Sequence, residues 1–238
     1  CCMNSCIARR VVACVLVGAP ASNCFADVDY LTQQRSIRGW ISAGIVVYDE
    51  TVSAPDFAPF NETLQGGYSG KGQSSNARAV QASRLDPGRI SFAGEVSAFN
   101  NHQQPFSSPG SRATSQLLVT FSVSTPTAFE LAGTIAGGFP STVFREYTLA
   151  LTSGAQTIVS RSSAGGLQYT NLNLTGSSVI QGTLPAGTYE LAIFVQISGG
   201  VREGGMTTYD LSLHVPSAAT LALPLAALPL AIRRRRHA

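Results

Sequence analysis

The stretch Tyr209-Asp210-Leu211-Ser212-Leu213-His214-Val215 alternates between large apolar residues and polar ones. Successive side chains of a β-strand point to opposite sides of the sheet. A period of two therefore predicts a strand with one face on a core and the other face in water. An amphipathic helix would instead repeat its apolar residues every three or four positions. The stretch indicates β structure for the last part of the folded body.

The same alternation recurs upstream, in the segments 117–123, 129–135, 147–151 and 189–197. Asp86-Pro87-Gly88 has proline and glycine where a type II turn needs them, which predicts a hairpin joining 77–85 to 89–99. About ten strands, separated by Gly-rich turns, predict an all-β fold. We expect a single antiparallel β-sandwich, jelly-roll-like, that spans residues 27–214.

Two regions lack a clear alternation, residues 54–75 and residues 100–112. Both are predicted to be long loops, and long loops in compact domains often carry function. The first region holds the glycine-rich segment 66–72 around Lys71. Only three residues separate its first Gly from the Gly-Lys pair where a phosphate-binding loop has four, so the segment is predicted to be a flexible loop.

The beginning of the chain has the three parts of a secretory signal peptide. Arg9-Arg10 precedes an apolar run over 11–19, and Cys24-Phe25-Ala26 supplies the small-residue pattern of a cleavage site. We expect translation to start at Met3 and residues 1–26 to form a signal helix for the export machinery. Signal peptidase would then cut between Ala26 and Asp27. A cut after Ala21 and lipidation of Cys24 are the alternatives.

The cysteines and the charges also separate the body from the two ends of the chain. All five cysteines, at positions 1, 2, 6, 14 and 24, precede the expected cleavage site, so the mature body would have no disulfide and no thiolate metal site. Ten of the sixteen Lys and Arg and all thirteen Asp and Glu lie within 27–214, which gives the body a net charge of −3. The body has no basic stripe, so nucleic-acid binding is not supported.

The chain ends with Val215 and Pro216, an apolar stretch over 218–232, and then Arg233, Arg234, Arg235 and Arg236. A helix of that apolar length spans about 22 Å. The bilayer core is about 30 Å thick, so the stretch enters a membrane and is marginal for crossing one. Arginines next to an apolar segment stay on the cytoplasmic side. The tail, residues 215–238, is thus predicted to be a membrane helix that anchors an exported chain.

The order of Val-Pro box, Leu/Ala-rich helix and terminal arginines resembles the PEP-CTERM sorting signal of exported bacterial proteins. Here Ser217 stands in place of the glutamate of the box, and Ala218 in place of its second proline. The resemblance covers residues 215–238. It implies an exosortase-type processing enzyme as a partner and at least transient membrane anchoring. It also implies a place in the cell envelope, at the cell surface or in the extracellular matrix. A plain single-span anchor is the alternative.

Four carboxylates, Asp49, Glu50, Asp56 and Glu62, follow the apolar run 40–48. They are interpreted first as solvated loop charges, second as a Ca²⁺ site and third as a catalytic pair. The body contains two histidines, His102 and His214, and no nucleophile-elbow motif. No cofactor, no resident metal and no catalytic residue is therefore predicted, with Ca²⁺ kept as an alternative.

Exposed aromatic rings can stack on sugars, and Trp40, Tyr48, Tyr68 and Tyr169 are the candidates for such a platform. Trp40 also opens the run 40–48, which can pack into the sandwich core instead. We expect an exported, non-enzymatic β-sandwich, tethered at or shed from the cell surface, that serves the extracellular matrix or adhesion. The alternatives are a carbohydrate-binding module with a polysaccharide partner and, third, a secreted hydrolase.

N-terminal sequencing of the exported protein tests the assignment of the signal peptide. We expect the mature chain to start at Asp27. Thiol reagents should not label it, because every cysteine precedes that position. A mature chain that starts at a lipid-modified Cys24 would contradict the assignment.

Overall fold

The computed structural model describes residues 27–43, 45–70, 73–101, 110–138, 144–163, 171–199 and 203–216. The predicted signal segment, most of the sorting tail with its four arginines, His102 and Tyr169 lie outside the described residues. In the part of the chain that is described, no helix is both long and apolar enough to cross a membrane.

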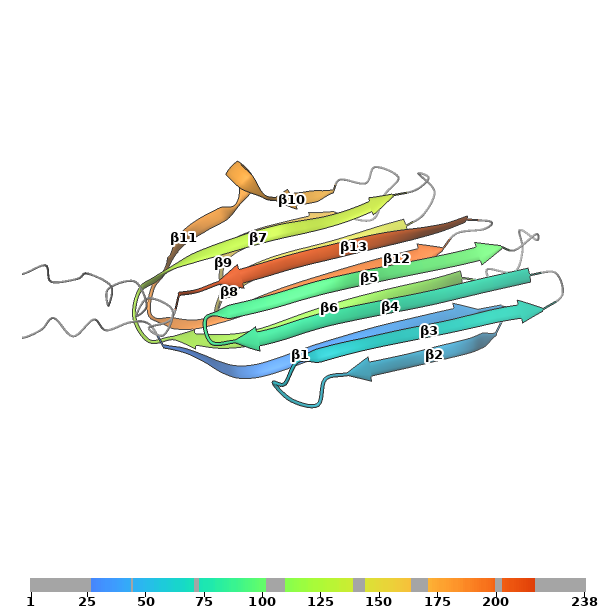
Figure 1. Ribbon diagram of the computed structural model, residues 1–238, viewed down its shortest axis with the longest axis horizontal. Helices are drawn as coiled ribbons and strands as arrows, with labels where there is room; N and C mark the ends of the chain where they lie inside the picture. The colour runs from blue at the N-terminus through green and yellow to red at the C-terminus, as the bar shows by residue number, and fades with distance from the viewer. Residues whose placement is uncertain are drawn as a thin grey trace, which may run out of the picture.

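Two antiparallel sheets face each other, and nearly every described residue belongs to one of them (Figure 1). In spatial order, sheet A consists of β2 (Val46–Ser53), β1 (Val28–Ser42), β6 (Gly110–Val123), β12 (Gly187–Gly199), β8 (Phe144–Ser153) and β9 (Gln156–Ser163). Sheet B consists of β10 (Leu172–Leu174), β7 (Thr127–Gly138), β13 (Glu203–His214), β5 (Arg89–Asn101), β4 (Gln73–Asp86) and β3 (Phe60–Gly70). The predicted all-β fold in antiparallel sheets is confirmed at this level.

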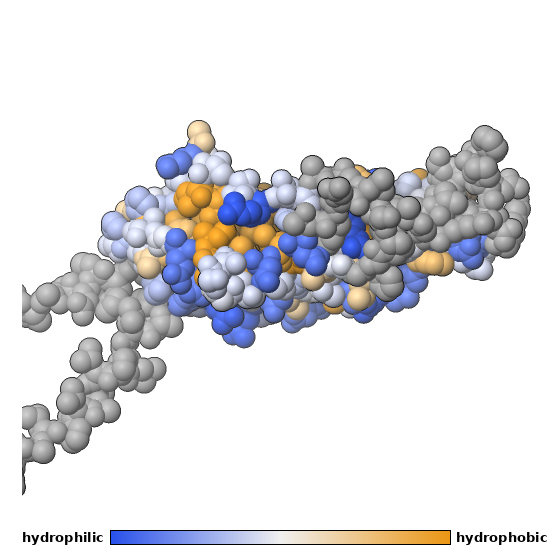
Figure 2. Space-filling model, turned by 90° about the horizontal axis from the view of Figure 1, so that it is seen from above, coloured by the Kyte–Doolittle hydropathy of each residue, from blue (hydrophilic) through white to orange (hydrophobic). Residues whose placement is uncertain are grey.

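The free edge of β7 is shared by two short strands. β10 pairs with one half of β7, and β11 (Ile180–Leu184) pairs with the other half after a single 3-10 turn, Gly176–Ser178. Leu172, Leu174 and Leu184 are buried within these strands. Hydrophobic surface is visible on this side of the molecule in Figure 2, between more hydrophilic rims.

The alternating segments lie in strands and put their apolar residues into one core. In β13, Tyr209, Leu211 and Leu213 are buried, while the residues between them are more exposed. The same holds for β6, β8 and β12, whose inward side chains form the core between the sheets. Each long strand thus has an inner and an outer row of side chains, as its period of two requires.

The predicted hairpin is also present. β4 and β5 pair from Asp86 and Arg89 outward, with Pro87 and Gly88 as the turn. Gly88 has a φ of 74°, which is the conformation that a type II turn needs at its third residue and that glycine adopts readily.

The first loop prediction is largely wrong, and the second is tested only at its two ends. Residues 60–70 form β3 and β4 begins at Gln73, so most of 54–75 is strand. Gly66 is not a mark of flexibility here. A Cβ atom at this position would lie 2.3 Å from the ring of Tyr48, so glycine makes room for an aromatic side chain. For the second region, residues 100–101 and 110–112 are also strand, and residues 102–109 lie outside the described part.

A chain of buried hydrogen bonds crosses the interior between the two sheets. Tyr209 of sheet B stacks on Phe92 and donates from its hydroxyl to the carbonyl oxygen of Val80, at 2.7 Å. The same hydroxyl lies 2.6 Å from Oγ of Ser115, which belongs to sheet A. The side-chain amide of Gln81 directs its Nε2 at sheet A. There its two N–H groups share three acceptors, which are Oγ of Ser115 and the carbonyl oxygens of Ser36 and Gln116. Buried polar groups that are satisfied in this way tie the sheets together.

Arg35, which is fully buried, links β1 to the connection between β2 and β3. Its guanidinium donates to the carbonyl oxygens of Asp56 and Ala58, and also reaches that of Ser83. The Nε of Arg35 donates to the side chain of Gln33. Because an arginine stays charged at any ordinary pH, these carbonyls offset the cost of taking its charge out of water.

Both ends of the described body lie at one end of the sandwich, which we name the near pole (Figure 1). The amide of Val215 donates to the carbonyl oxygen of Gly88, at 2.8 Å, in the β4–β5 turn. The hydroxyl of Tyr30, close to the start of β1, donates to the carbonyl oxygen of Asp86 in the same turn and lies 3.1 Å from that of Arg89. Tyr30 and Val215, each within three residues of an end of the described body, are therefore held by the same turn.

The buried hydroxyl of Tyr209 predicts a pH-dependent stability. Burial raises the pKa of Tyr209 well above its ordinary value of about 10. Because the folded state then holds this proton to a higher pH than the unfolded chain does, its stabilisation is complete below about pH 10 and is lost as the pH rises further. As the pH rises above about 10, the unfolding free energy of the wild type should therefore fall more steeply than that of Tyr209→Phe. The difference in slope should be up to about 1.4 kcal/mol per pH unit.

Urea unfolding between pH 7 and pH 11.5 measures this difference. At pH 7, Tyr209→Phe should be less stable by about 1–3 kcal/mol, since two buried partners lose their hydrogen bond. Parallel pH profiles for the two proteins would contradict the role given to Tyr209.

Candidate functional site

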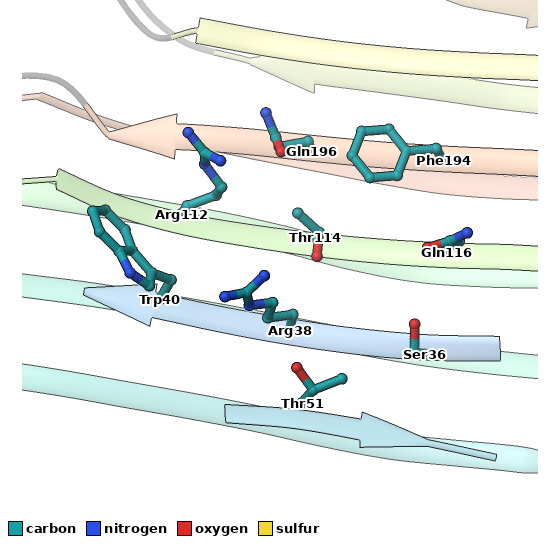
Figure 3. A pocket seen from close by; sticks show the side chains of 9 residues that line it. All are labelled: Ser36, Arg38, Trp40, Thr51, Arg112, Thr114, Gln116, Phe194 and Gln196. Carbon is teal, nitrogen blue, oxygen red and sulfur yellow. The ribbon is translucent and has the colours of Figure 1, made fainter. Parts of the chain in front are cut away.

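The outer face of sheet A carries a hollow of about 420 Å³ (Figure 3). Its lining comes from four neighbouring strands, β2, β1, β6 and β12, and from side chains that point away from the core. In β1 the odd-numbered residues from Arg35 to Ile41 are buried, so the even-numbered ones project outward. We call these outward-facing residues, together with their partners on β2, β6 and β12, the outer face.

Strands β1 and β2 provide one side of the hollow. Ser36, Arg38 and Trp40 succeed one another along β1, and Thr51 of β2 is paired with Arg38. Trp40 is half-buried and lies on the outer face. The interpretation of the run 40–48 as core holds for Ile41, which is fully buried. It is wrong for Trp40, and also for Ile45, Val46 and Val47, which are exposed.

Strands β6 and β12 provide the other side. Arg112, Thr114 and Gln116 of β6 are paired with Trp40, Arg38 and Ser36 of β1, respectively. Gln196 and Phe194 of β12 are paired in turn with Thr114 and Gln116. The hollow is therefore a regular grid of cross-strand neighbours, and Figure 3 shows these side chains standing on adjacent strands.

One of the two arginines in the hollow is already engaged by a carboxylate. Arg38 donates through Nε and Nη2 to the two oxygens of Asp49, each at 2.8 Å. These hydrogen bonds hold the pKa of the exposed Asp49 carboxyl below its usual range, so Asp49 is ionised at neutral pH. The pair is a bidentate arginine–carboxylate contact on the protein surface.

The other arginine lies beside the indole ring. The Cζ atom of Arg112 is 6.0 Å from the ring centroid of Trp40, which is within cation–π range. Gly110 lies against the same ring, because a Cβ atom there would be 3.1 Å from Cζ3 of Trp40. Within the described part of the chain, Arg112 has no carboxylate partner. Its charge is available to a ligand.

The structure does not bring together the three platform candidates that it describes, Trp40, Tyr48 and Tyr68. Tyr48 is paired with Ile41 on the inner side of sheet A, and its ring packs over Gly39 and Gly66. Its hydroxyl donates to Glu50, and burial raises its pKa to about 12. Tyr68 faces inward on β3 of the other sheet, paired with the buried Ser75. Of the three, only Trp40 is on the outer face.

The candidate carboxylates are also dispersed. Asp49 binds Arg38 on the outer face, Glu50 receives the Tyr48 hydroxyl, Asp56 lies in the β2–β3 connection, and Glu62 is paired with Gln81 in sheet B. Among the described residues, no three His, Cys, Asp or Glu side chains are close enough to hold a metal ion. His214 lies at the end of β13, paired with Arg89 and Glu130.

Sequence reasoning missed most of the hollow, namely Ser36, Arg38, Thr51, Arg112, Thr114, Gln116, Phe194 and Gln196. The signal was available within single strands, since the polar positions of an alternating strand face outward. What no local pattern supplies is the pairing of β1 with β6 and β12, which lie far from β1 in the sequence.

Comparisons with known proteins add no family to this picture. No protein-family model matches the chain, and no curated protein matches it at a significant level. The candidate site therefore stands on its own geometry.

The described lining combines two aromatic rings, two arginines, hydroxyls and amides, with no histidine, aspartate or glutamate. These groups can stack on a ring, donate hydrogen bonds and hold an anion. The arrangement is thus suited to binding.

Trp40 is the single tryptophan of the chain, so its fluorescence reports on the hollow directly. We expect iodide to quench it more strongly than caesium, because Arg112 adds a positive charge 6.0 Å from the ring. The variant Arg112→Gln removes this charge, so its iodide quenching constant should be about two- to threefold lower at low salt.

The matched control is Arg84→Gln, which removes the same charge from sheet B. Neutral acrylamide should quench all three proteins equally. If iodide quenching is the same in Arg112→Gln and in the wild type, then Arg112 does not create a positive field at Trp40.

Proposed function

We propose that this chain is an exported, non-enzymatic β-sandwich protein, tethered at the cell surface or shed from it, that serves the extracellular matrix or adhesion. The observation that supports the proposal most is the shared position of the two ends of the body. Tyr30, near the start of the body, and Val215, near its end, both form hydrogen bonds to the β4–β5 turn. A signal peptide and a sorting tail would then leave from one pole, and the rest of the sandwich would project outward.

The geometry fits a body that presents its outer face away from a membrane. From Val28 to Trp40, β1 rises about 40 Å along the sandwich. The hollow around Trp40 is thus several Debye lengths from the near pole at physiological salt. Charges at a membrane surface next to that pole would not interfere with binding. Signal peptidase and an exosortase-type enzyme are the partners that we propose for processing.

We further propose that the sandwich is jelly-roll-like. In support, the chain changes sheets at each step from β5 to β8, from β9 to β10, and again from β11 to β13. Such repeated crossing differs from the meander of β3, β4 and β5, which stay in one sheet.

Carbohydrate binding is the second candidate function, and the hollow around Trp40 is the observation that favours it. Sugars present flat apolar ring faces that stack on an indole, and hydroxyl groups that need donors and acceptors. Trp40 offers the ring, and the hydroxyl and amide side chains of Thr114, Gln116 and Gln196 offer the hydrogen bonds.

Deleting Arg233–Arg236 tests the tethering proposal. The apolar stretch is short and contains Pro224 and Pro229, which disfavour a continuous helix, so its own hold on a bilayer is modest. Each arginine near the bilayer centre costs about 2.5–3.5 kcal/mol, so the cluster opposes complete translocation. We expect the deletion to move the protein from the membrane fraction to the medium.

The control is the protease resistance of the body in the same samples. It should not change, because the deletion lies beyond Pro216. A deletion variant that stays fully membrane-bound would contradict retention by the arginines. A body that becomes protease-sensitive would show that the tail is part of the fold.

A further inference from the structure

Of the two arginines that line the hollow, one is paired with a carboxylate and the other is not. Arg38 is neutralised by Asp49 in a bidentate contact. Arg112 is exposed, and it lies over the ring of Trp40 with no carboxylate partner among the described residues. Arg112 is therefore equipped to receive a carboxylate as Arg38 does, since the planar guanidinium matches the two oxygens of that group.

The shape of the face favours an extended ligand over a small ion. Trp40 and Phe194 lie at opposite corners of the grid, two strands apart and four residues apart along the strands. At standard strand spacing and rise, this diagonal is about 16 Å. The polar side chains of Thr114, Gln116 and Gln196 line the hollow between the rings of Trp40 and Phe194. A ligand that satisfies this face is long, has rings to stack, and has many hydroxyl groups.

The charges around the hollow set where an anionic ligand can run. The unpaired positive group is Arg112 of β6, because Arg38 of β1 is bound by Asp49, the cross-strand partner of Trp40 on β2. Glu146 of β8 is paired with Gln196 on the far side of the grid. An acidic chain is attracted to the Trp40–Arg112 side and repelled from the β8 side. Since the body carries a net charge of −3, binding of a polyanion depends on this local patch and not on the charge of the whole protein.

We propose that the outer face of sheet A binds an acidic polysaccharide whose sugar rings carry carboxylate groups, as in a polyuronate. A sugar ring stacks on Trp40, its carboxylate receives the donors of Arg112, and neighbouring hydroxyl groups bond to Thr114, Gln116 and Gln196. This inference deepens the carbohydrate-binding candidate above and rests on the proposed extracellular setting only for its biological context.

Calorimetric titration of the purified protein with polygalacturonate tests the proposal, and dextran serves as the neutral polymer. Wild type should bind polygalacturonate and should bind it more weakly as salt rises, because exposed charges are screened. Arg112→Gln should lose at least about tenfold in affinity, as expected when a hydrogen-bonded charged contact is removed. The affinity of Arg112→Lys should lie between those of the wild type and Arg112→Gln, since lysine keeps the charge and lacks the planar guanidinium group.

Two further variants complete the design. Trp40→Ala should lose binding while circular dichroism stays that of the wild type, because the side chain lies on the outer face. Arg84→Gln on sheet B removes an equal charge and should bind like the wild type. An equal loss in Arg84→Gln and Arg112→Gln would overturn the site, because it would show a general charge effect.

The remaining outcomes separate this inference from the proposed function. A folded, exported wild type that does not bind polygalacturonate, or that binds dextran equally well, overturns the acidic-polysaccharide inference alone. A protein that binds polygalacturonate but is never exported overturns the proposed function alone. Unchanged binding in Arg112→Gln contradicts the role of that residue whatever the polymer.

Discussion

The register of β1, β6 and β12 is the constraint on which the rest of this structure depends. β6 is paired with β1 on one side and with β12 on the other over nearly its whole length. Because side chains alternate between the two faces, one alignment places Leu117 and Ile193 in the core and Arg112 and Gln196 outside. A slip by a single residue would exchange the two faces, and both the core and the hollow would be lost.

The interior of the sandwich supports the outer face directly. The carbonyl oxygens of Ser36 and Gln116, two residues that line the hollow, accept hydrogen bonds from Gln81 of the opposite sheet. Ser115, next to Gln116, belongs to the same buried network as Tyr209. A shift of β6 relative to sheet B would leave these polar groups unpaired in the core, at a cost of about 1–3 kcal/mol each. The polar interior thus fixes the strand that carries Arg112.

The sequence predicted the parts of the fold that local patterns encode. Alternation identified β6, β8, β12 and β13, and the proline–glycine turn identified the β4–β5 hairpin. It failed where glycine serves packing: Gly66 indicates a loop by composition, yet it lies in β3 because the ring of Tyr48 occupies the space of a side chain. Trp40 was one of the candidates, but Arg112 was not, since their contact depends on a pairing between residues 72 positions apart.

A pair of engineered cysteines measures the register, on which both faces depend, most directly. The body from 27 to 216 contains no cysteine, so a new disulfide is unambiguous. Thr114 and Gln196 are cross-strand partners on the outer face, and facing residues have Cα atoms about 4.5–5.5 Å apart, which suits a disulfide. Thr114→Cys with Gln196→Cys should form the bond on mild oxidation, and Thr114→Cys with Ile197→Cys should not. A bond in the second pair and none in the first would contradict the register, and with it the outer face.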